Sequence, residues 1–176
     1  MDNRCDKLWV APRKPVKGWC LIQRWLRKDA SVKPRKEDSM KLRTLYAFGR
    51  KFNASFAEVE EKVREELAKE NYGILTEINV NDTFKKKLDR DFRDYVILGA
   101  CNPTLAWDAF AKEINIGTLM PCNVVVYRDD DDKTIVMVMD SVAALGLIGN
   151  ADLTDIAVQV RAKMEQMLDT LSVWYG

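Results

Sequence analysis

Two short motifs carry the residues of this chain that are best suited to chemistry. In the first, an apolar run over residues 96–98 breaks at Gly99 and leads through Cys101 to Asn102 and Pro103. Asn is a favoured helix N-cap, and Pro suits the first helical position because its missing N–H would have no partner there. We therefore expect Cys101 one residue before a helix N-cap, where the helix dipole favours a thiolate and attracts anions.

The second motif contains a second thiol, Cys122, between Pro121 and Asn123. Pro121 removes a backbone donor beside this thiol, which fits a strand start, an edge or a bulge where backbone is free to meet a ligand. We expect the two motifs to form a cleft that binds a small or anionic ligand, with Cys101 as the ligand-facing or redox-active thiol and two Asn amides as orienting groups. The candidate ligand-binding residues are Gly99, Cys101, Asn102, Pro103, Pro121, Cys122 and Asn123.

Two other interpretations of the thiols stay open. Cys101 is the candidate catalytic residue if the protein is an enzyme, as nucleophile or redox centre, and it then needs a carboxylate or Lys within hydrogen-bond reach. Alternatively, Cys101 and Cys122 are both core residues, because Cys is among the most buried residue types. The protein would then be a structural or interaction module.

Composition excludes several classes of function. The chain has no His, which removes imidazole-based hydrolases, His-ligated zinc and His-ligated haem. Its four Cys have no C-x-x-C spacing and no nucleotide-binding glycine motif occurs, so we expect neither a metal nor a cofactor. The net charge of +1 argues against nucleic acid or an anionic membrane as partner. Without a signal peptide or a membrane-length apolar run, the expected location is the cytoplasm, where thiols stay reduced.

The first part of the chain differs from the rest. Residues 1–40 contain 11 Lys or Arg against 5 Asp or Glu, and three of the five Trp. Prolines leave too little uninterrupted length there for an isolated helix. We expect residues 1–39 to be a basic extension without stable structure, or a segment that native translation from Met40 leaves out. Residues 40–176 are expected to form a single domain.

Hydrophobic periodicity predicts a mixture of strands and helices in that domain. Strands are expected over 42–48, 74–80, 92–100, 119–127 and 134–139, with four Asp at a solvated hairpin tip before the last. Helices are expected after a Ser55–Glu58 capping box and over 83–88, 103–114, 141–147 and 152–171. These elements predict an α+β two-layer sandwich, with a mostly antiparallel sheet of about five strands and helices packed on one face.

The runs over residues 95–106 and 116–127 resemble the domain-of-unknown-function 302 family. The resemblance extends over residues 42–172 and includes the segments 73–78 and 82–88. It implies a compact α+β fold and a homodimer, and it implies no known reaction. The family usually begins near the position of Met40, which agrees with translation starting there.

Overall fold

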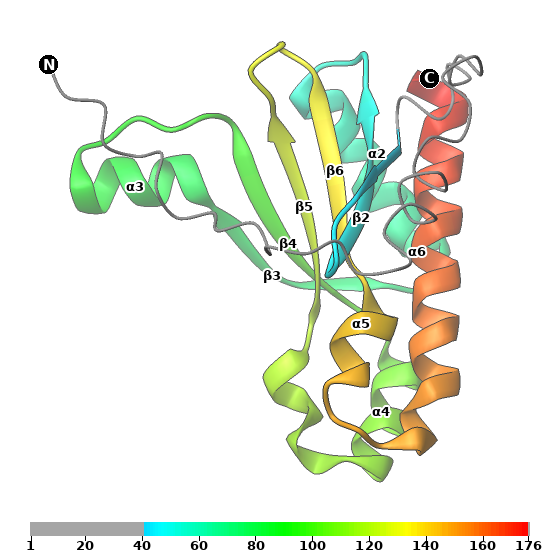
Figure 1. Ribbon diagram of the computed structural model, residues 1–176. Helices are drawn as coiled ribbons and strands as arrows, with labels where there is room; N and C mark the ends of the chain where they lie inside the picture. The colour runs from blue at the N-terminus through cyan, green and yellow to red at the C-terminus, as the bar shows by residue number, and fades with distance from the viewer. Residues whose placement is uncertain (1–40, 176) are drawn as a thin grey trace, which may run out of the picture. The chain divides into compact units, whose positions relative to one another are not determined.

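A six-stranded antiparallel sheet organises the chain in a computed structural model that describes residues 41–175 (Figure 1). The extension predicted over residues 1–39 lies outside the described residues. The strand order is β1-β2-β6-β5-β4-β3, and each neighbouring pair is antiparallel. The strands are β1 (Lys41–Arg43), β2 (Ala47–Phe52), β3 (Gly73–Asn79), β4 (Tyr95–Cys101), β5 (Cys122–Arg128) and β6 (Thr134–Met139). The predicted α+β class is confirmed, with six strands in place of about five.

The additional strand arises from a turn inside the segment predicted as one strand. The Thr44 N–H donates to the Ala47 carbonyl at 2.8 Å, and the Ala47 N–H donates to the Thr44 hydroxyl at 2.9 Å. Such local bonds from a Thr hydroxyl compete with the extended conformation and favour turns. The chain therefore folds back as the β1–β2 hairpin.

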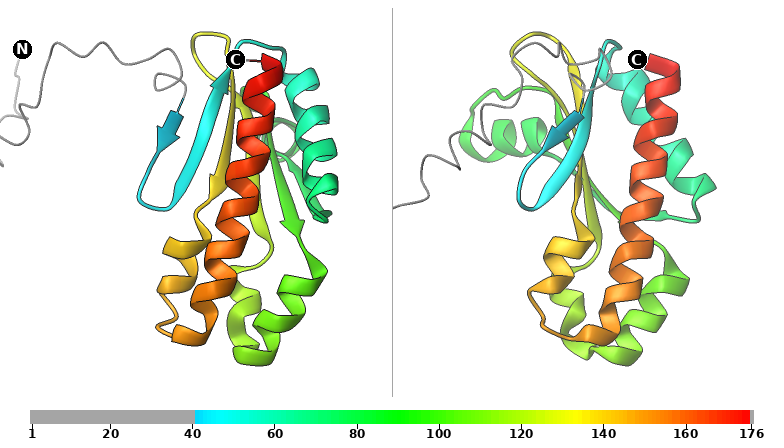
Figure 2. Two further views of the ribbon diagram at one scale, coloured as in Figure 1. Left: turned by 90° about the vertical axis from the view of Figure 1, so that its right-hand side faces the viewer. Right: turned by 45° about the vertical axis from the view of Figure 1, so that its right-hand side comes forward.

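Two helices cover one face of the sheet, α2 (Phe56–Lys69) and α6 (Thr154–Tyr175), as Figures 1 and 2 show. The predicted capping box starts α2: Ser55 and Glu58 bond each other's backbone N–H groups. Asn71, with φ of 62°, turns the chain after α2, and Gly73 already belongs to β3. Both helices turn their apolar stripes toward the sheet, as their periodicity predicts.

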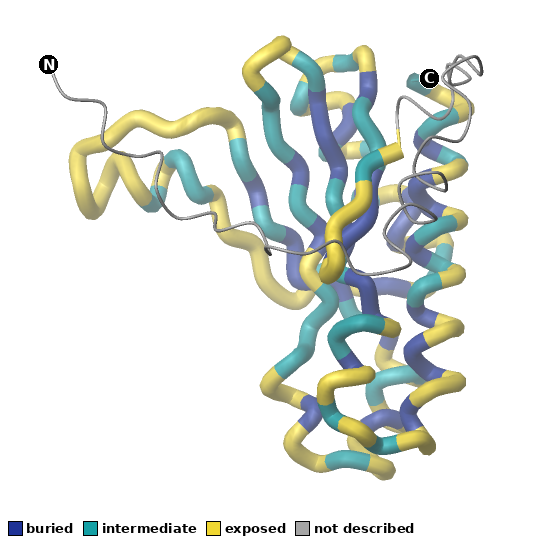
Figure 3. Tube along the Cα trace, viewed as in Figure 1, coloured by how far each residue is buried: buried dark blue, intermediate teal, exposed yellow. Residues whose placement is uncertain are grey.

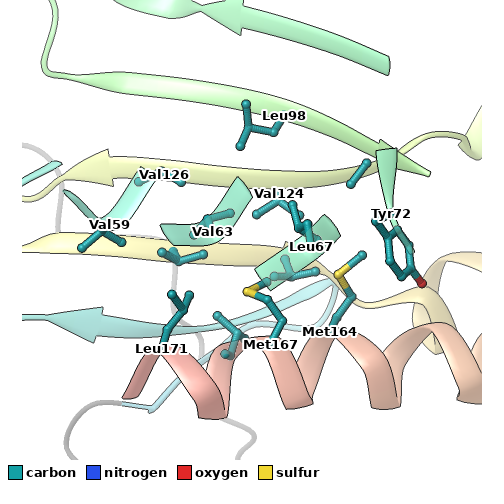
Figure 4. Close-up of a cluster of buried hydrophobic side chains, with 14 of the residues drawn as sticks. Val59, Val63, Leu67, Tyr72, Leu98, Val124, Val126, Met164, Met167 and Leu171 are labelled. Carbon is teal, nitrogen blue, oxygen red and sulfur yellow. The ribbon is translucent and has the colours of Figure 1, made fainter. Parts of the chain in front are cut away.

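The main core lies between these helices and the sheet (Figures 3 and 4). Alternate residues of the central strands point into it, because side chains along a strand alternate between its faces. Its fully buried members include Phe52, Val59, Val63, Leu67, Leu98, Val124, Val126, Val136, Val138, Leu168 and Leu171.

A second, smaller core lies beyond one end of the sheet. It is built by α4 (Pro103–Lys112), the 3-10 helix Ile114–Leu119, α5 (Ser141–Gly146), the 3-10 helix Ala151–Leu153 and the start of α6 (Figure 1). Its buried residues are Ala109, Ile116, Leu145, Leu153, Ile156, Ala157 and Val160. The expected arrangement, with all helices on one face of the sheet, therefore holds for α2 and α6, while α4 and α5 extend the fold past the sheet.

The helix α3 (Val80–Leu88) lies on the side of the sheet opposite to α2 and α6 (Figures 1 and 2). It is longer than predicted because Asn79, rather than a later residue, caps it by accepting from the Asp82 N–H at 3.0 Å. The sheet face on this side, here called the open face, presents Tyr95, Ile97, Val125 and Met137.

The four consecutive Asp residues lie at the β5–β6 turn, as predicted. Each carboxylate forms an ion pair: Lys51 contacts Asp129 and Asp131, Arg93 contacts Asp130, and Arg128 contacts Asp132. Exposed pairs of this kind contribute little to stability. Among the helices of residues 41–175, none combines the length and the apolar character needed to span a bilayer.

Candidate functional site

The two cysteine motifs lie on neighbouring strands and are divided between the two faces of the sheet. Cys122 lies opposite Ala100, which is fully buried on the core side. The next residue, Asn123, lies opposite Gly99 and faces the other way. Because faces alternate along a strand, the Cys122 side chain points toward the cores and the Asn123 side chain toward the open face.

A cavity of about 40 Å³ lies where the main core meets the second core. We call it the end cavity, and its polar lining residues are Tyr72, Cys101, Asn102, Cys122 and Ser141. Its other lining residues are Ala100, Leu105, Ala106, Ala109, Ile116, Leu119, Met120, Met139, Leu145, Ile156 and Val160. A single water needs about 10–15 Å³ of such volume, so the end cavity has room for a few small atoms or groups.

Both thiols of the described residues are free, and both line the end cavity. Burial raises the pKa of Cys122 to about 11, with a smaller contribution from the nearby Cys101 thiol. Burial also raises the pKa of Cys101 above its ordinary value. This direction is opposite to the lowering of the Cys101 pKa that we expected from the helix dipole, because burial disfavours the charged thiolate.

Tyr72 provides a polar group that sequence reasoning missed. Its side chain is only 4% exposed, and its hydroxyl has no hydrogen-bond partner. In Figure 4 this hydroxyl lies on the side of the ring away from Leu67 and Val124. Burial raises the pKa of Tyr72 well above its usual range, and the two thiols add to the shift. The sequence around residue 72 carries no signal that this side chain is buried beside the two thiols.

The amide of Asn102 is already engaged by the protein. Its Oδ1 accepts from the Leu105 N–H at 3.1 Å, which makes it the predicted N-cap of α4 with Pro103 in the first turn. Its Nδ2 donates to the carbonyl of Glu70, just after α2, at 3.4 Å. Asn102 thus joins the start of α4 to the end of α2 and holds one wall of the end cavity.

Gly99, Pro121 and Asn123 lie away from the end cavity. A Cβ on Gly99 would stand 2.2 Å from Thr76 Oγ1 and 2.6 Å from Pro121 Cγ, so only Gly allows these side chains to cross β4. Asn123 is exposed and lines a separate hollow on the open face. The structure therefore brings together Cys101, Asn102 and Cys122 of the predicted residues and adds Tyr72.

No side chain that lines the end cavity carries a formal charge. In the described part of the chain, no three His, Cys, Asp or Glu side chains lie close enough together to hold a metal ion. The chemistry of this site is that of a largely apolar chamber with two neutral thiols, the hydroxyls of Tyr72 and Ser141, and the amide of Asn102.

An antiparallel sheet backed by two helices, with a sulfur-containing cavity at its end, defines a small α+β protein. The chain belongs to the family described as "Domain of unknown function DUF302", whose family model matches residues 48–171. A similar solved structure is the uncharacterized conserved protein DUF302 from Bacillus stearothermophilus, with a TM-score of 0.67 and 24% sequence identity. That match covers 72% of this chain and 98% of the other. No curated protein matches the chain.

Proposed function

We propose that this protein binds a small, uncharged molecule in the end cavity, with Cys101 and Cys122 facing the ligand. The observation that supports this most strongly is the Tyr72 hydroxyl, which is buried, unpartnered and next to a cavity. Leaving a buried polar group without a partner costs about 1–3 kcal/mol. A ligand that accepts a hydrogen bond from this hydroxyl would recover that free energy.

The character of the end cavity favours an uncharged ligand over the anion considered from the sequence. Its lining has no Lys or Arg, and burial raises the pKa of both thiols. At the start of α4, Pro103 has no N–H and that of Leu105 is bound by Asn102. Few of the N–H groups that bind anions at helix starts therefore remain.

The same features favour binding over catalysis by Cys101. A cysteine nucleophile acts as the thiolate, usually beside a base or another group that lowers its pKa. The end cavity offers Cys101 no carboxylate, Lys or His, and its pKa is raised. A site with free thiols requires reducing conditions, so we place the protein in the cytoplasm.

A titration with small molecules tests this proposal. The full chain, labelled with ¹³C at its Met methyl groups, is titrated with acetone, acetamide or dimethyl sulfide, and the Met120 signal is followed by NMR. We expect a saturable shift, because Met120 lines the end cavity. Tyr72→Phe should weaken binding of acetone and acetamide, which accept hydrogen bonds, more than binding of dimethyl sulfide.

Thiol labelling provides the second readout. Methyl methanethiolsulfonate is small and uncharged, and it should modify Cys101 or Cys122 in the folded protein, as read by peptide mass spectrometry. A larger, sulfonate-bearing thiosulfonate should modify them only on unfolding. If no probe shifts Met120 and both thiols stay unmodified until denaturant is added, the ligand proposal fails.

An interaction module assembled as a homodimer is the second candidate function. The observation that favours it is α3, which has no buried residue.

A further inference from the structure

The polar groups of the end cavity differ in whether the protein already uses them. Ser141 donates its hydroxyl hydrogen to a carbonyl of α6 at 2.7 Å, and the amide of Asn102 is bound at both ends. The Tyr72 hydroxyl has no hydrogen-bond partner among the described residues, and Cys101 and Cys122 are free thiols. The end cavity therefore leaves three groups for a ligand, two thiols and one hydroxyl.

These three groups come from the same end of three neighbouring strands. Tyr72 directly precedes β3, whose first residue Gly73 lies opposite Cys101, the last residue of β4. Cys122 is the first residue of β5 and lies opposite Ala100. The pKa of Tyr72 is raised in part by both thiols, and the pKa of Cys122 in part by the Cys101 thiol. The two sulfur atoms and the hydroxyl therefore act on one another across the end cavity.

The neutral lining restricts the ligands that can bond to these thiols. It contains no Lys or Arg to balance an anion and no carboxylate to balance a cation. A charge without a partner in such an interior is costly, and burial raises the pKa of both thiols. A ligand that bonds to sulfur here must do so without leaving a net charge, as when a thiol replaces a hydroxyl group and water is lost.

The size of the end cavity narrows the choice further. Its volume of about 40 Å³ corresponds to roughly three or four water-sized atoms, because one water needs about 10–15 Å³. Arsenous acid, As(OH)₃, consists of one arsenic and three oxygen atoms and is uncharged at neutral pH. Trivalent arsenic bonds strongly to thiols, and a hydroxyl that remains on it can accept a hydrogen bond.

We propose that the end cavity captures arsenous acid through Cys101 and Cys122. Two As–S bonds form and two As–O bonds break, and each released hydroxyl leaves as water with the proton of one thiol. Arsenic stays trivalent and every species is neutral. The hydroxyl that remains on arsenic accepts the hydrogen bond of Tyr72. This inference rests on the proposed function, because arsenous acid uses the same cavity and the same thiols.

Mass spectrometry of the intact protein under native conditions tests the capture. The full chain with Cys5→Ser and Cys20→Ser is incubated with sodium arsenite, and we expect one AsOH unit in place of two hydrogen atoms. Cys101→Ser and Cys122→Ser should each weaken binding on the order of 100-fold or more, since a second bond to the same ligand is then lost. Arsenate, which is anionic, should give no adduct. Circular dichroism checks that the variants are folded.

Tyr72→Phe separates the hydroxyl from the thiols. It should keep the adduct and weaken arsenite binding roughly two- to tenfold, which is the usual contribution of one hydrogen bond. Tyr175→Phe is the matched control, because the Tyr175 hydroxyl donates to the carbonyl of Glu58 and does not line the end cavity. It should leave arsenite binding unchanged.

Two measurements need no substitution in the folded domain. Arsenite should protect Cys101 and Cys122 from methyl methanethiolsulfonate in the folded protein. It should also raise the urea midpoint, because the folded chain holds both thiols together, whereas the unfolded chain must first close the loop of residues 101–122.

The outcomes distinguish this inference from the proposal beneath it. If methyl methanethiolsulfonate modifies the thiols of the folded protein but arsenite gives neither adduct nor protection, the arsenic inference fails and the small-molecule site stands. Binding that is unchanged by either Cys→Ser substitution, or an equal adduct with arsenate, also overturns the inference. If neither reagent reaches the thiols until denaturant is added, the inference and the proposed function fail together.

Discussion

Cys122 lies directly opposite Ala100 in the ladder between β5 and β4, and this pairing decides where the second thiol points. Ala100 is fully buried, and Cys122 packs against both the main core and the second core. A shift of one residue in this register would exchange Cys122 with Asn123 and place the thiol on the open face. The register therefore places the Cys122 thiol on the core side of the sheet, where it lines the end cavity.

Replacing Tyr72 by Phe will raise the free energy of unfolding by about 1 kcal/mol, because it removes a buried hydroxyl without a partner. Urea denaturation measures this change. Tyr175→Phe is the control, since the Tyr175 hydroxyl is exposed and donates to the Glu58 carbonyl at 3.4 Å. A loss of more than 1 kcal/mol in Tyr72→Phe would instead mean that the hydroxyl has a partner in solution.

The folded protein will lose stability as the pH rises above about 9. Cys122 has an ordinary pKa of 9.0 and a folded pKa of about 11, so the unfolded chain releases this proton first. The stabilisation from the neutral thiol is complete below pH 9 and is lost progressively up to about pH 11, on the order of 2 kcal/mol. Urea denaturation at several pH values measures the slope. Cys122→Ser should flatten it between pH 9 and 11, and an unchanged slope in this variant contradicts the assignment.

Gly99→Ala will destabilise the fold by about 1–3 kcal/mol, because the new methyl group would overlap Thr76 and Pro121. Gly73→Ala, on the neighbouring strand, is a matched control with no atom within 4 Å of its added Cβ, and it should change stability by less than about 0.5 kcal/mol. Equal effects of the two substitutions on the urea midpoint would contradict the close packing across β4.

Asn102→Ala will cost about 1–2 kcal/mol, since it removes the N-cap of α4 and the bond to the Glu70 carbonyl. Asn102→Asp keeps the acceptor for the Leu105 N–H and loses only the donor to the Glu70 carbonyl. It should therefore retain most of the stability that Asn102→Ala loses. Thermal unfolding of the two variants compares these contributions. If Asp is no better than Ala, the capping bond is not the main role of Asn102.

Local signals predicted much of the fold because they act within a few residues. The Ser55–Glu58 capping box and the Asn102–Pro103 helix start each depend on bonds within one helical turn, and both form as expected. Thr44 was harder to interpret, since its hydroxyl favours a turn in a segment whose strand-forming residues favour extension. The choice between them depends on the distant strand β6, whose pairing with β2 begins at Ala47, just after the turn.

The candidate site could be predicted only in part. Sequence reasoning identified Cys101, Asn102 and Cys122 but missed Tyr72, because nothing near residue 72 in the sequence reports that its hydroxyl is buried beside them. It expected a depressed thiol pKa at Cys101 from the helix dipole, which is a local effect. Burial of the thiol raises the pKa instead, and the residues that share the end cavity with Cys101 come from segments as distant in the chain as Tyr72 and Val160.

The sequence by itself determined the α+β class, most of the helices and strands, the helix caps and the absence of His chemistry, because composition, periodicity and capping act along the chain. The tertiary structure decided which motif residues share a cavity, that Asn123 faces away from the cavity that Cys122 lines, and that α3 buries none of its side chains among residues 41–175. These depend on strand register and on packing between distant elements, which are settled by the burial of whole faces rather than by neighbouring residues.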